Sequence, residues 1–393
     1  MTPAATPLTI MLSCGEASGE LYAAALARAI HAQAPGTRIV ALGGARLREA
    51  GVELLADYHG ISVTGLSEAL RVVPRSLALI RELGRAADRI RPDVFVPIDF
   101  PDFNFGLMRA MAKRGVPIVY YISPQLWAWR KGRMRTMQRL VSKVLPIFPF
   151  EEKLYREAGV DAEFVGHPLV DLVEPSADRA TLRARLGAAD GPLIALLPGS
   201  RANELRAILP DMARAAAIAA ARLPGARFVL ARAPRLADEL FAPLADLMPG
   251  IPVVFSDAAD DVLAAADVVI TASGTATVQA ALHEVPMVIV YRVSALTSFI
   301  GRRFVTLDTF GMVNLIAGER IVPELVQERF TPQAVADEVV SLASDGARRQ
   351  AMVARLREVK ETLGGKGGST RAAAAILRVA ADSRSRAEGT TLP

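Results

Sequence analysis

The chain alternates short apolar runs with alanine- and arginine-rich stretches of ten or more residues, and this alternation most constrains its fold. The first series of runs predicts strands at Thr9–Leu12, Arg38–Leu42, Val94–Ile98, Ile118–Ile122, Val144–Ile147 and Glu163–Val165. The second series predicts strands at Leu193–Leu197, Arg227–Ala231, Pro252–Phe255, Val268–Thr271 and Met287–Tyr291. Continuous apolar strands separated by helices indicate parallel sheets covered by helices on both faces. We therefore expect an α/β protein with two Rossmann-like domains.

A polar, proline-containing stretch, Asp171–Arg179, separates the two series and has the composition of an interdomain linker. Beyond it, Pro332–Arg378 has helical character, interrupted at Gly364–Gly368. The sequence thus predicts a first domain at 1–172, a second at 173–345, and C-terminal helices with a tail at 346–393.

Composition narrows the class of protein. Apolar residues make up 51% and charged residues 22% of the 393, which permits a substantial core. The net charge of +5 suits an anionic membrane surface or a phosphorylated ligand, but the chain lacks the dense basic run expected of a nucleic-acid-binding protein. Cys14 is the single cysteine, and the N-terminus lacks a signal-like apolar core, so a cytoplasmic location is expected. The four scattered histidines predict no metal site.

The first predicted strand runs into a glycine-bearing turn, Gly15 to Glu20, which precedes an alanine-rich helix. A strand, a turn and a helix N-terminus in this order form a site for anions or polar ligands. Glu16 and Ser18 are expected at the carboxyl edge of the sheet. Alternatively, Ser18 is simply the N-cap of the helix.

A second turn of the first domain carries two carboxylates, Asp99 and Asp102, directly after a predicted strand. Ligands of open α/β sheets bind outside the carboxyl ends of the strands, so both are candidates for acid–base work. Asp102 could instead cap the helix that follows it. Asp99 precedes Pro101 and is less easily explained as a cap, which favours it as the general base.

The second domain has two hydroxyl-rich turns, each at the end of a predicted strand. Ser200 and Arg201 follow one strand, and Gly274 and Thr275 open the helix after another. Backbone N–H groups, the serine hydroxyl and the arginine fork could together bind a diphosphate. Such turns also commonly cap helices, although finding two of them in one domain strengthens the interpretation as a phosphate site.

Both tryptophans lie in the stretch 120–130, where Trp127 could stack on a sugar or simply pack at a domain edge. His167 lies in the approach to the linker and is a candidate for shaping the substrate site.

The segment Leu66–Ile90 mixes apolar and arginine side chains. An apolar surface with basic flanks, including Arg71 and Arg75, suits binding at a membrane surface. An ordinary packed helix with a solvated arginine face is the alternative. The candidate membrane-contacting residues are Leu66, Leu70, Val72, Val73 and Leu77.

Taken together, these motifs resemble the lipid A disaccharide synthase family. The matching stretches run in order through the chain: GEASGE (15–20), ISVTGLSEAL (61–70), PDVFVPIDFPDFN (92–104), YYISPQLWAWR (120–130), FVGHPLVD (164–171), LLPGSRANEL (196–205), ASGTATVQAAL (272–282), PMVIVYR (286–292) and VPELVQ (322–327). The pair YYISPQLWAWR and FVGHPL is the most specific. The resemblance implies a GT-B fold, in which two Rossmann-like domains face a cleft, with C-terminal helices.

The resemblance also implies the reaction. The family transfers 2,3-diacylglucosamine from UDP-2,3-diacylglucosamine to 2,3-diacylglucosamine 1-phosphate, giving a β-1,6-linked disaccharide 1-phosphate and UDP. Because the donor is α-linked and the product β-linked, the reaction inverts, and direct displacement with a general base is the simplest mechanism. No metal or other cofactor is implied. The expected partners are these two substrates and the cytoplasmic face of the inner membrane, with no nucleic acid, and a homodimer is kept as a possibility.

The family pattern of functional residues maps onto Glu16, Ser18, Asp99, Arg201, Asn314 and Gln327. The chain departs from the pattern at Glu20, where the family usually has Asp, and at Gln279, where it usually has Glu. In related GT-B enzymes that glutamate accepts hydrogen bonds from the uridine ribose, and an amide oxygen is a weaker acceptor than a carboxylate.

Two other kinds of protein compete with this interpretation. One is another GT-B enzyme that uses a UDP-sugar, either a peptidoglycan-type N-acetylglucosaminyltransferase or a UDP-sugar 2-epimerase. The other is a carrier that binds lipid or nucleotide without turnover and has no need of Asp99.

Overall fold

The computed structural model describes residues 7–58, 66–124, 131–188, 190–233, 236–292 and 311–389; the side chains of 66–72, 131 and 387–389 are outside this description. The chain divides into two compact units. Unit 1 contains residues 1–171 and 363–393, and unit 2 contains residues 172–362. The segment 346–393, expected to follow both domains, is thus divided between them, and its last helix belongs to unit 1.

Unit 1 is built on parallel strands whose order places the first strand in the middle. Its sheet has the order β3-β2-β1-β4, and isolated bridges from Phe95 to Ile118 and from Ile98 to Tyr121 bring the parallel pair β5-β6 alongside β4. The strands are β1 (Thr9–Ser13), β2 (Arg38–Gly43), β3 (Glu53–Asp57), β4 (Val94–Pro97), β5 (Val119–Tyr121) and β6 (Lys143–Leu145). This is the doubly wound arrangement expected from the alternation of apolar runs and helices.

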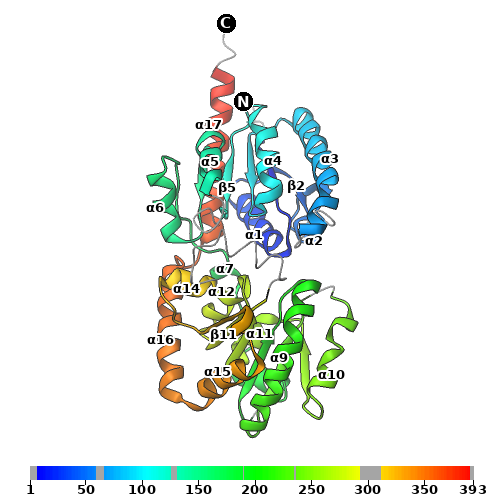
Figure 1. The fold of residues 1–393 in the computed structure, drawn as a ribbon. Helices are drawn as coiled ribbons and strands as arrows, with labels where there is room; N and C mark the ends of the chain where they lie inside the picture. Colours follow the sequence, from blue (N-terminus) through cyan, green and yellow to red (C-terminus); the bar gives the residue numbers. More distant parts are fainter. Residues whose placement is uncertain are drawn as a thin grey trace. The chain divides into compact units, whose positions relative to one another are not determined.

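Helices cover the sheet of unit 1 (Figure 1). They are α1 (Ala17–Gln33), α2 (Ala45–Glu49), α3 (Leu66–Ile90), α4 (Pro101–Ala112), α5 (Met134–Leu140), α6 (Pro149–Glu157) and α17 (Gly368–Gly389), with a 3₁₀ turn η1 (Lys131–Arg133). The short helix α7 (Leu169–Leu172) ends at the first residue of unit 2. The C-terminal helix α17 packs along α1, so the two ends of the sequence share one core.

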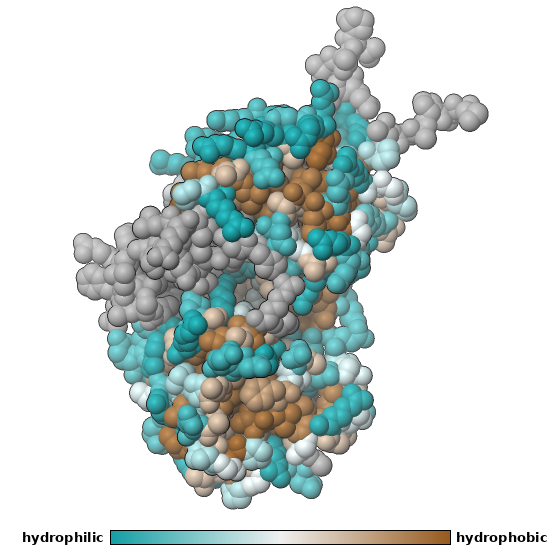
Figure 2. Space-filling view, turned by 90° about the vertical axis from the view of Figure 1, so that its right-hand side faces the viewer, coloured by the Kyte–Doolittle hydropathy of each residue, from teal (hydrophilic) through white to brown (hydrophobic). Residues whose placement is uncertain are grey.

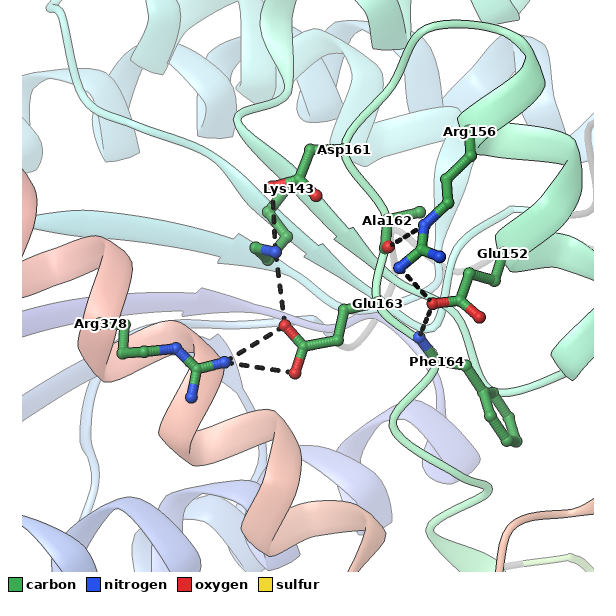
Figure 3. Close-up of polar contacts among 8 residues, drawn as sticks. All are labelled: Lys143, Glu152, Arg156, Asp161, Ala162, Glu163, Phe164 and Arg378. Atoms are coloured by element: carbon green, nitrogen blue, oxygen red, sulfur yellow. Dashed lines mark hydrogen bonds and ion pairs between the residues drawn. The ribbon is translucent and has the colours of Figure 1, made fainter.

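The predicted strand at Glu163–Val165 is wrong. In the described structure an isolated bridge joins Val144 to Ala162, directly before this segment, and residues 163–165 themselves are irregular chain. The Glu163 N–H donates to the Val144 carbonyl at 3.0 Å and the Val165 N–H to the Pro146 carbonyl at 3.3 Å. Side-chain contacts hold the segment as well (Figure 3). The Glu163 carboxylate pairs with Lys143 and accepts from Arg378 of α17 at 3.2 Å, and Glu152 accepts from the Phe164 N–H at 3.1 Å. The segment therefore joins β6 to α17.

Unit 2 has one six-stranded parallel sheet in the order β12-β11-β10-β7-β8-β9. Its strands are β7 (Leu193–Leu197), β8 (Arg227–Ala231), β9 (Val253–Ser256), β10 (Val268–Ala272), β11 (Met287–Tyr291) and β12 (Glu324–Val326). Its helices are α8 (Arg179–Arg185), α9 (Ala202–Arg222), α10 (Pro243–Leu247), α11 (Ala259–Ala265), α12 (Thr275–Leu282), α14 (Met312–Ala317), α15 (Pro332–Ser344) and α16 (Gly346–Thr362), with 3₁₀ turns η2 (Asp238–Phe241) and η3 (Gln327–Arg329). As in unit 1, the first strand lies centrally and the order reverses beside it.

Each unit has its own apolar core, made by strands buried on both faces and by the facing sides of the helices. The surface seen in Figure 2 is mostly hydrophilic, with hydrophobic patches in each unit. Among the described residues, the exposed large apolar side chains are Val73 and Leu77 on α3 and Val254 and Phe255 on β9.

Candidate functional site

The turns singled out in the sequence lie at the point of each sheet where the strand order reverses. In unit 1, Ser13 at the end of β1 is level with Pro97 at the end of β4. In unit 2, Leu197 at the end of β7 is level with Thr271 near the end of β10. Crevices at such reversal points bind the ligands of open α/β sheets. Each unit therefore carries one candidate site.

The two turns of unit 1 pack against each other. Phe100, after β4, places its ring against Gly15, after β1, and a Cβ at Gly15 would lie 2.1 Å from a ring atom. Only glycine fits there. Phe100 also stacks on Phe103, with ring centroids 5.5 Å apart.

Asp99, the predicted base, has a left-handed backbone. Its φ is +47°, and Phe100 follows at +49°. For residues other than glycine this conformation is sparsely populated and costs about 1–3 kcal/mol each. Such strain persists where the surrounding structure enforces it, and it concentrates at functional sites. Asp99 is half-buried, so its carboxylate is not sealed into the core.

A buried hydrogen-bonded group encloses the Asp99 carbonyl. Asn104 donates to this oxygen from Nδ2 at 2.7 Å, and the Tyr120 hydroxyl donates to it at 2.9 Å. Asn104 also accepts from the Ser13 hydroxyl at 2.6 Å, which links it to the end of β1. Burial, followed by the charge of Asp99, raises the pKa of Tyr120 well above its ordinary value, so its hydroxyl stays a neutral donor.

The other predicted residues of unit 1 have distinct positions. Glu16 occupies the N-cap position of α1, and Ser18 lies one residue inside the helix, so the alternative that Ser18 is the cap is wrong. Asp102 likewise lies inside α4, whose N-cap position is Phe100. Its exposed carboxylate pairs with Arg133 at 2.7 Å.

Glu20, which departs from the family pattern, is buried and serves the fold. Its carboxylate accepts from the Arg46 N–H at 2.8 Å and from the Tyr58 hydroxyl at 2.9 Å. The Arg46 amide belongs to the first turn of α2, so the side chain of Glu20 connects α1 to that helix.

His167 lies inside unit 1 at 3% exposure. Its Nδ1 accepts from the Leu169 N–H at 3.1 Å, and its ring packs against Tyr22 and Phe148. Burial lowers the pKa of His167 to about 3, so the ring is neutral at physiological pH. Its backbone N–H donates to the Leu363 carbonyl, where the chain re-enters unit 1. His167 thus supports the joint with the C-terminal segment.

In unit 2, the carboxylate of Glu204 lies at the turn after β7. Gly199 has a φ of +113°, and Glu204 of α9 folds back toward it. The Glu204 carboxylate accepts from the Ser200 N–H at 3.2 Å and pairs with Arg201 at 3.1 Å. A diphosphate at this turn would therefore meet an arginine that is partly neutralised and an amide that is already used.

The turn after β10 is more open. Gly274 has a φ of +146° and occupies the N-cap position of α12, followed by the exposed Thr275. One turn into the helix, Gln279 donates from Nε2 to an Asp260 oxygen at 2.7 Å, and His283 contacts the same oxygen at 2.9 Å. Gln279, which stands where the family usually has glutamate, thus has an amide that can donate to the neighbouring Asp260 carboxylate.

Asn314 and Gln327 lie on either side of β12. Asn314 is 1% exposed and uses its whole amide in the fold: it donates to the Val322 carbonyl and to Glu324, and accepts from the Ile321 and Val322 N–H groups. It shapes the loop before β12 from inside. Gln327 is half-buried and has a positive φ of +55°.

The described residues include only two of the five side chains predicted to contact a membrane. Val73 and Leu77 are 49% and 47% exposed, so neither belongs to the core. The side chains of Leu66, Leu70 and Val72, and the whole of Trp127, lie outside the described residues.

Sequence reasoning missed the residues that act from inside: Asn104, Tyr120, Glu204, Asp260 and Glu324. A fold-back glutamate three positions after an N-cap is a known helix-start signal, so Glu204 could have been found. The others are polar residues whose partners are distant in sequence. Within the described ranges, no group of acidic, histidine or cysteine side chains could hold a metal ion. The same ranges include no helix of the length and apolarity needed to span a bilayer.

The chain matches the family model described as lipid-A-disaccharide synthetase over residues 10–377. It is 44% identical over 375 residues to the lipid-A-disaccharide synthase of Myxococcus xanthus, covering 95% of this chain and 98% of the relative. The enzyme of the same name from Koribacter versatilis is 43% identical, with coverage of 95% and 99%.

Solved structures agree in fold at low sequence identity. The UDP-GlcNAc 2-epimerase of Neisseria meningitidis, solved with UDP-GlcNAc bound, matches with a TM-score of 0.66 at 11% identity, covering 95% of this chain and all of the other. Acinetobacter baumannii MurG matches with a TM-score of 0.59 at 15% identity, covering 95% and 99%. At these identities the likeness extends to the fold alone, which is of the GT-B type.

Proposed function

The chain belongs to the lipid A disaccharide synthase family, and from this premise we propose that it joins two acylated glucosamine units with release of UDP. The donor is UDP-2,3-diacylglucosamine and the acceptor is 2,3-diacylglucosamine 1-phosphate. The observation that carries the proposal is the family match from residue 10 to residue 377, which includes the turns at the strand-order reversals of both units.

Unit 1 supplies the base in this proposal. Asp99 takes the proton of the acceptor 6-hydroxyl as that oxygen attacks the anomeric carbon of the donor. The new C–O bond forms while the bond from the anomeric carbon to UDP breaks, and the electron pair leaves with the diphosphate. Attack from the side opposite the leaving group converts the α-linked donor into a β-1,6-linked product. The half-buried position of Asp99 at the sheet's carboxyl edge supports this role.

Unit 2 binds the donor nucleotide in this proposal. The N-terminus of α12, with Gly274 and Thr275, offers backbone N–H groups to the diphosphate, and Arg201 offers its guanidinium. Ser200 contributes less than its sequence position suggested, because Glu204 already accepts from its N–H. Charge on the departing diphosphate is stabilised by these donors.

The test is turnover of the Asp99→Asn variant with both acylated substrates. We expect a loss of roughly a hundredfold or more, since a positioned base contributes about 10²–10⁴. Asp102→Asn is measured beside it, because Asp102 is the neighbouring carboxylate and pairs with Arg133; if Asp99 is the base, the Asp102 variant should keep its turnover. Circular dichroism and thermal unfolding check that both variants fold. Near-normal turnover of Asp99→Asn would move the role of base to Glu16 or Asp102.

Product analysis separates the alternatives. Incubation with both substrates should give a disaccharide 1-phosphate and stoichiometric UDP. A 2-epimerase would instead change the sugar of UDP-GlcNAc without an acceptor, and a carrier would bind the donor without releasing UDP. Either result would contradict the proposal.

We further propose that α3 contacts the cytoplasmic surface of the inner membrane, where acylated substrates reside. Val73 and Leu77 expose about half of their surface, and Arg75 lies between them. Because each side chain is already half buried, inserting it contributes about half of the 1.5–3 kcal/mol of full burial, or about 1 kcal/mol, and an arginine near anionic lipid adds about 1 kcal/mol. Contributions of this size give reversible attachment.

The membrane proposal is tested with Val73→Ser/Leu77→Ser and vesicles that contain anionic lipid. We expect weaker cosedimentation, with a melting temperature close to that of the parent because both side chains are already exposed. Val254→Ser/Phe255→Ser is the matched control, since it removes the two large exposed apolar side chains found among the described residues of unit 2. Undiminished vesicle binding by the folded α3 variant would place the contact elsewhere.

A further inference from the structure

Three non-glycine residues at the carboxyl edge of the unit 1 sheet have left-handed backbones. Asp99 and Phe100 are consecutive, with φ of +47° and +49°, and Ile122 after β5 has +56°. The Asp99 N–H points toward this second turn, 3.3 Å from the carbonyl oxygens of Tyr121 and Ile122. An isolated peptide would relax out of this conformation, so the protein must hold it.

Hydrogen bonds to the Asp99 carbonyl hold this left-handed backbone conformation. Two buried donors converge on this oxygen, Asn104 at 2.7 Å and Tyr120 at 2.9 Å. Both residues are 0% exposed, so water does not compete for the same acceptor. A carbonyl fixed by two donors cannot rotate without leaving both of them unsatisfied in the core, which is costly.

Asn104 is itself anchored to the neighbouring strand. Its Oδ1 accepts from the Ser13 hydroxyl at 2.6 Å, and its Nδ2 lies 3.4 Å from the Ser13 carbonyl. The side chain therefore connects the end of β1 to the residue after β4, across the reversal of the strand order. Asn104 lies in α4, only five residues after Asp99, so this helix places the donor amide directly at the Asp99 carbonyl.

We propose that Asn104 and Tyr120 are positioning residues that hold Asp99 in its left-handed conformation and so direct its carboxylate to the acceptor hydroxyl. The proposal rests on the proposed role of Asp99 as base. Rotation of Asp99 to an extended backbone would turn its Cβ and carboxylate away from the acceptor hydroxyl. Small misplacements of a reacting group lower turnover strongly. Neither Asn104 nor Tyr120 needs to touch substrate.

The experiment measures kcat and KM for Tyr120→Phe, which removes one hydroxyl, and for Asn104→Ala. Both changes should lower kcat by roughly ten- to a hundredfold and leave the KM for the UDP-linked donor unchanged, because the donor site is in unit 2. Tyr155→Phe is the matched control. It also removes a buried hydroxyl that donates to a backbone carbonyl, that of Pro124 at 3.1 Å, and it should retain kcat.

The same two changes are then made in the Asp99→Asn background. If they act through the Asp99 carboxylate, they cause no further loss once it is gone. An equal loss in both backgrounds, or a normal kcat for Tyr120→Phe, overturns the proposal. Near-normal kcat of Asp99→Asn alone contradicts the proposed base, and the positioning proposal with it. A strong loss in Asp99→Asn beside a normal Tyr120→Phe contradicts only the positioning proposal.

Discussion

Arg201 and Glu204 should have opposite effects on UDP affinity. Their side chains pair at 3.1 Å, with the arginine 38% and the glutamate 16% exposed. Arg201→Ala removes a cation from the diphosphate, whereas Glu204→Gln removes an anion and keeps an oxygen that can accept from the Ser200 N–H. The two substitutions therefore separate attraction from repulsion within one turn.

The magnitudes follow from the pair. A hydrogen bond to a charged group contributes about 1.5–3 kcal/mol. The net contribution of Arg201 to UDP binding should be smaller, because Arg201 already forms a partly exposed ion pair with Glu204 that contributes up to about 1 kcal/mol. We expect Arg201→Ala to weaken UDP binding by about 1–2 kcal/mol, or roughly five- to thirtyfold. Glu204→Gln should tighten it by up to about 1 kcal/mol, or fivefold.

Isothermal titration calorimetry with UDP is the assay, at about 0.05 M and about 0.5 M salt, because screening should shrink both effects. Arg214→Ala is the matched control. It breaks another pair of the same spacing on α9, with Asp211, further along the helix. An unchanged affinity for Arg201→Ala would refute the diphosphate role. Weaker binding by Glu204→Gln would refute the repulsion argument and indicate that Glu204 mainly orients Arg201.

Three further predictions concern stability. Burial lowers the pKa of His167 from 6.5 to about 3, so as the pH drops below 6.5 the unfolded chain takes up a proton that the folded chain does not. The free energy of unfolding should therefore fall, by up to about 2 kcal/mol at pH 5 in chemical denaturation. The His167→Gln variant should lack this loss. Asp171 accepts from the Gly367 N–H at 2.6 Å beside the start of α17, so Asp171→Ala should lower the unfolding free energy by about 1–2 kcal/mol, and protection of α17 amides from hydrogen exchange should fall with it. Gln279→Glu places a carboxylate against Asp260 and should lower the melting temperature at about pH 8 more than the uncharged Gln279→Met does; equal melting temperatures would contradict the repulsion.

The strands that the sequence predicted well are those whose apolar runs are continuous. β1, β4, β7 and β10 are buried on both faces, and their pattern depends on the residues alone. Two strands were missed: β3, which begins and ends with a charged residue, and β12, which has only three residues and begins with Glu324. The segment Glu163–Val165 makes two backbone hydrogen bonds to residues at the end of β6 but does not form a regular strand, and side-chain contacts to α17 help to hold it.

The sequence by itself identified the turns that are candidates for carrying chemistry, because glycine, hydroxyl and carboxylate residues after apolar strands can be recognised locally. Only the tertiary structure decided what each side chain does. Asp99 is held in its left-handed backbone by Asn104 and Tyr120, which come from α4 and β5. Asn314, predicted at the substrate, spends its amide inside the loop before β12. A hydrogen bond depends on distance and direction in space, and residues far apart in the chain acquire both only when the sheet has formed.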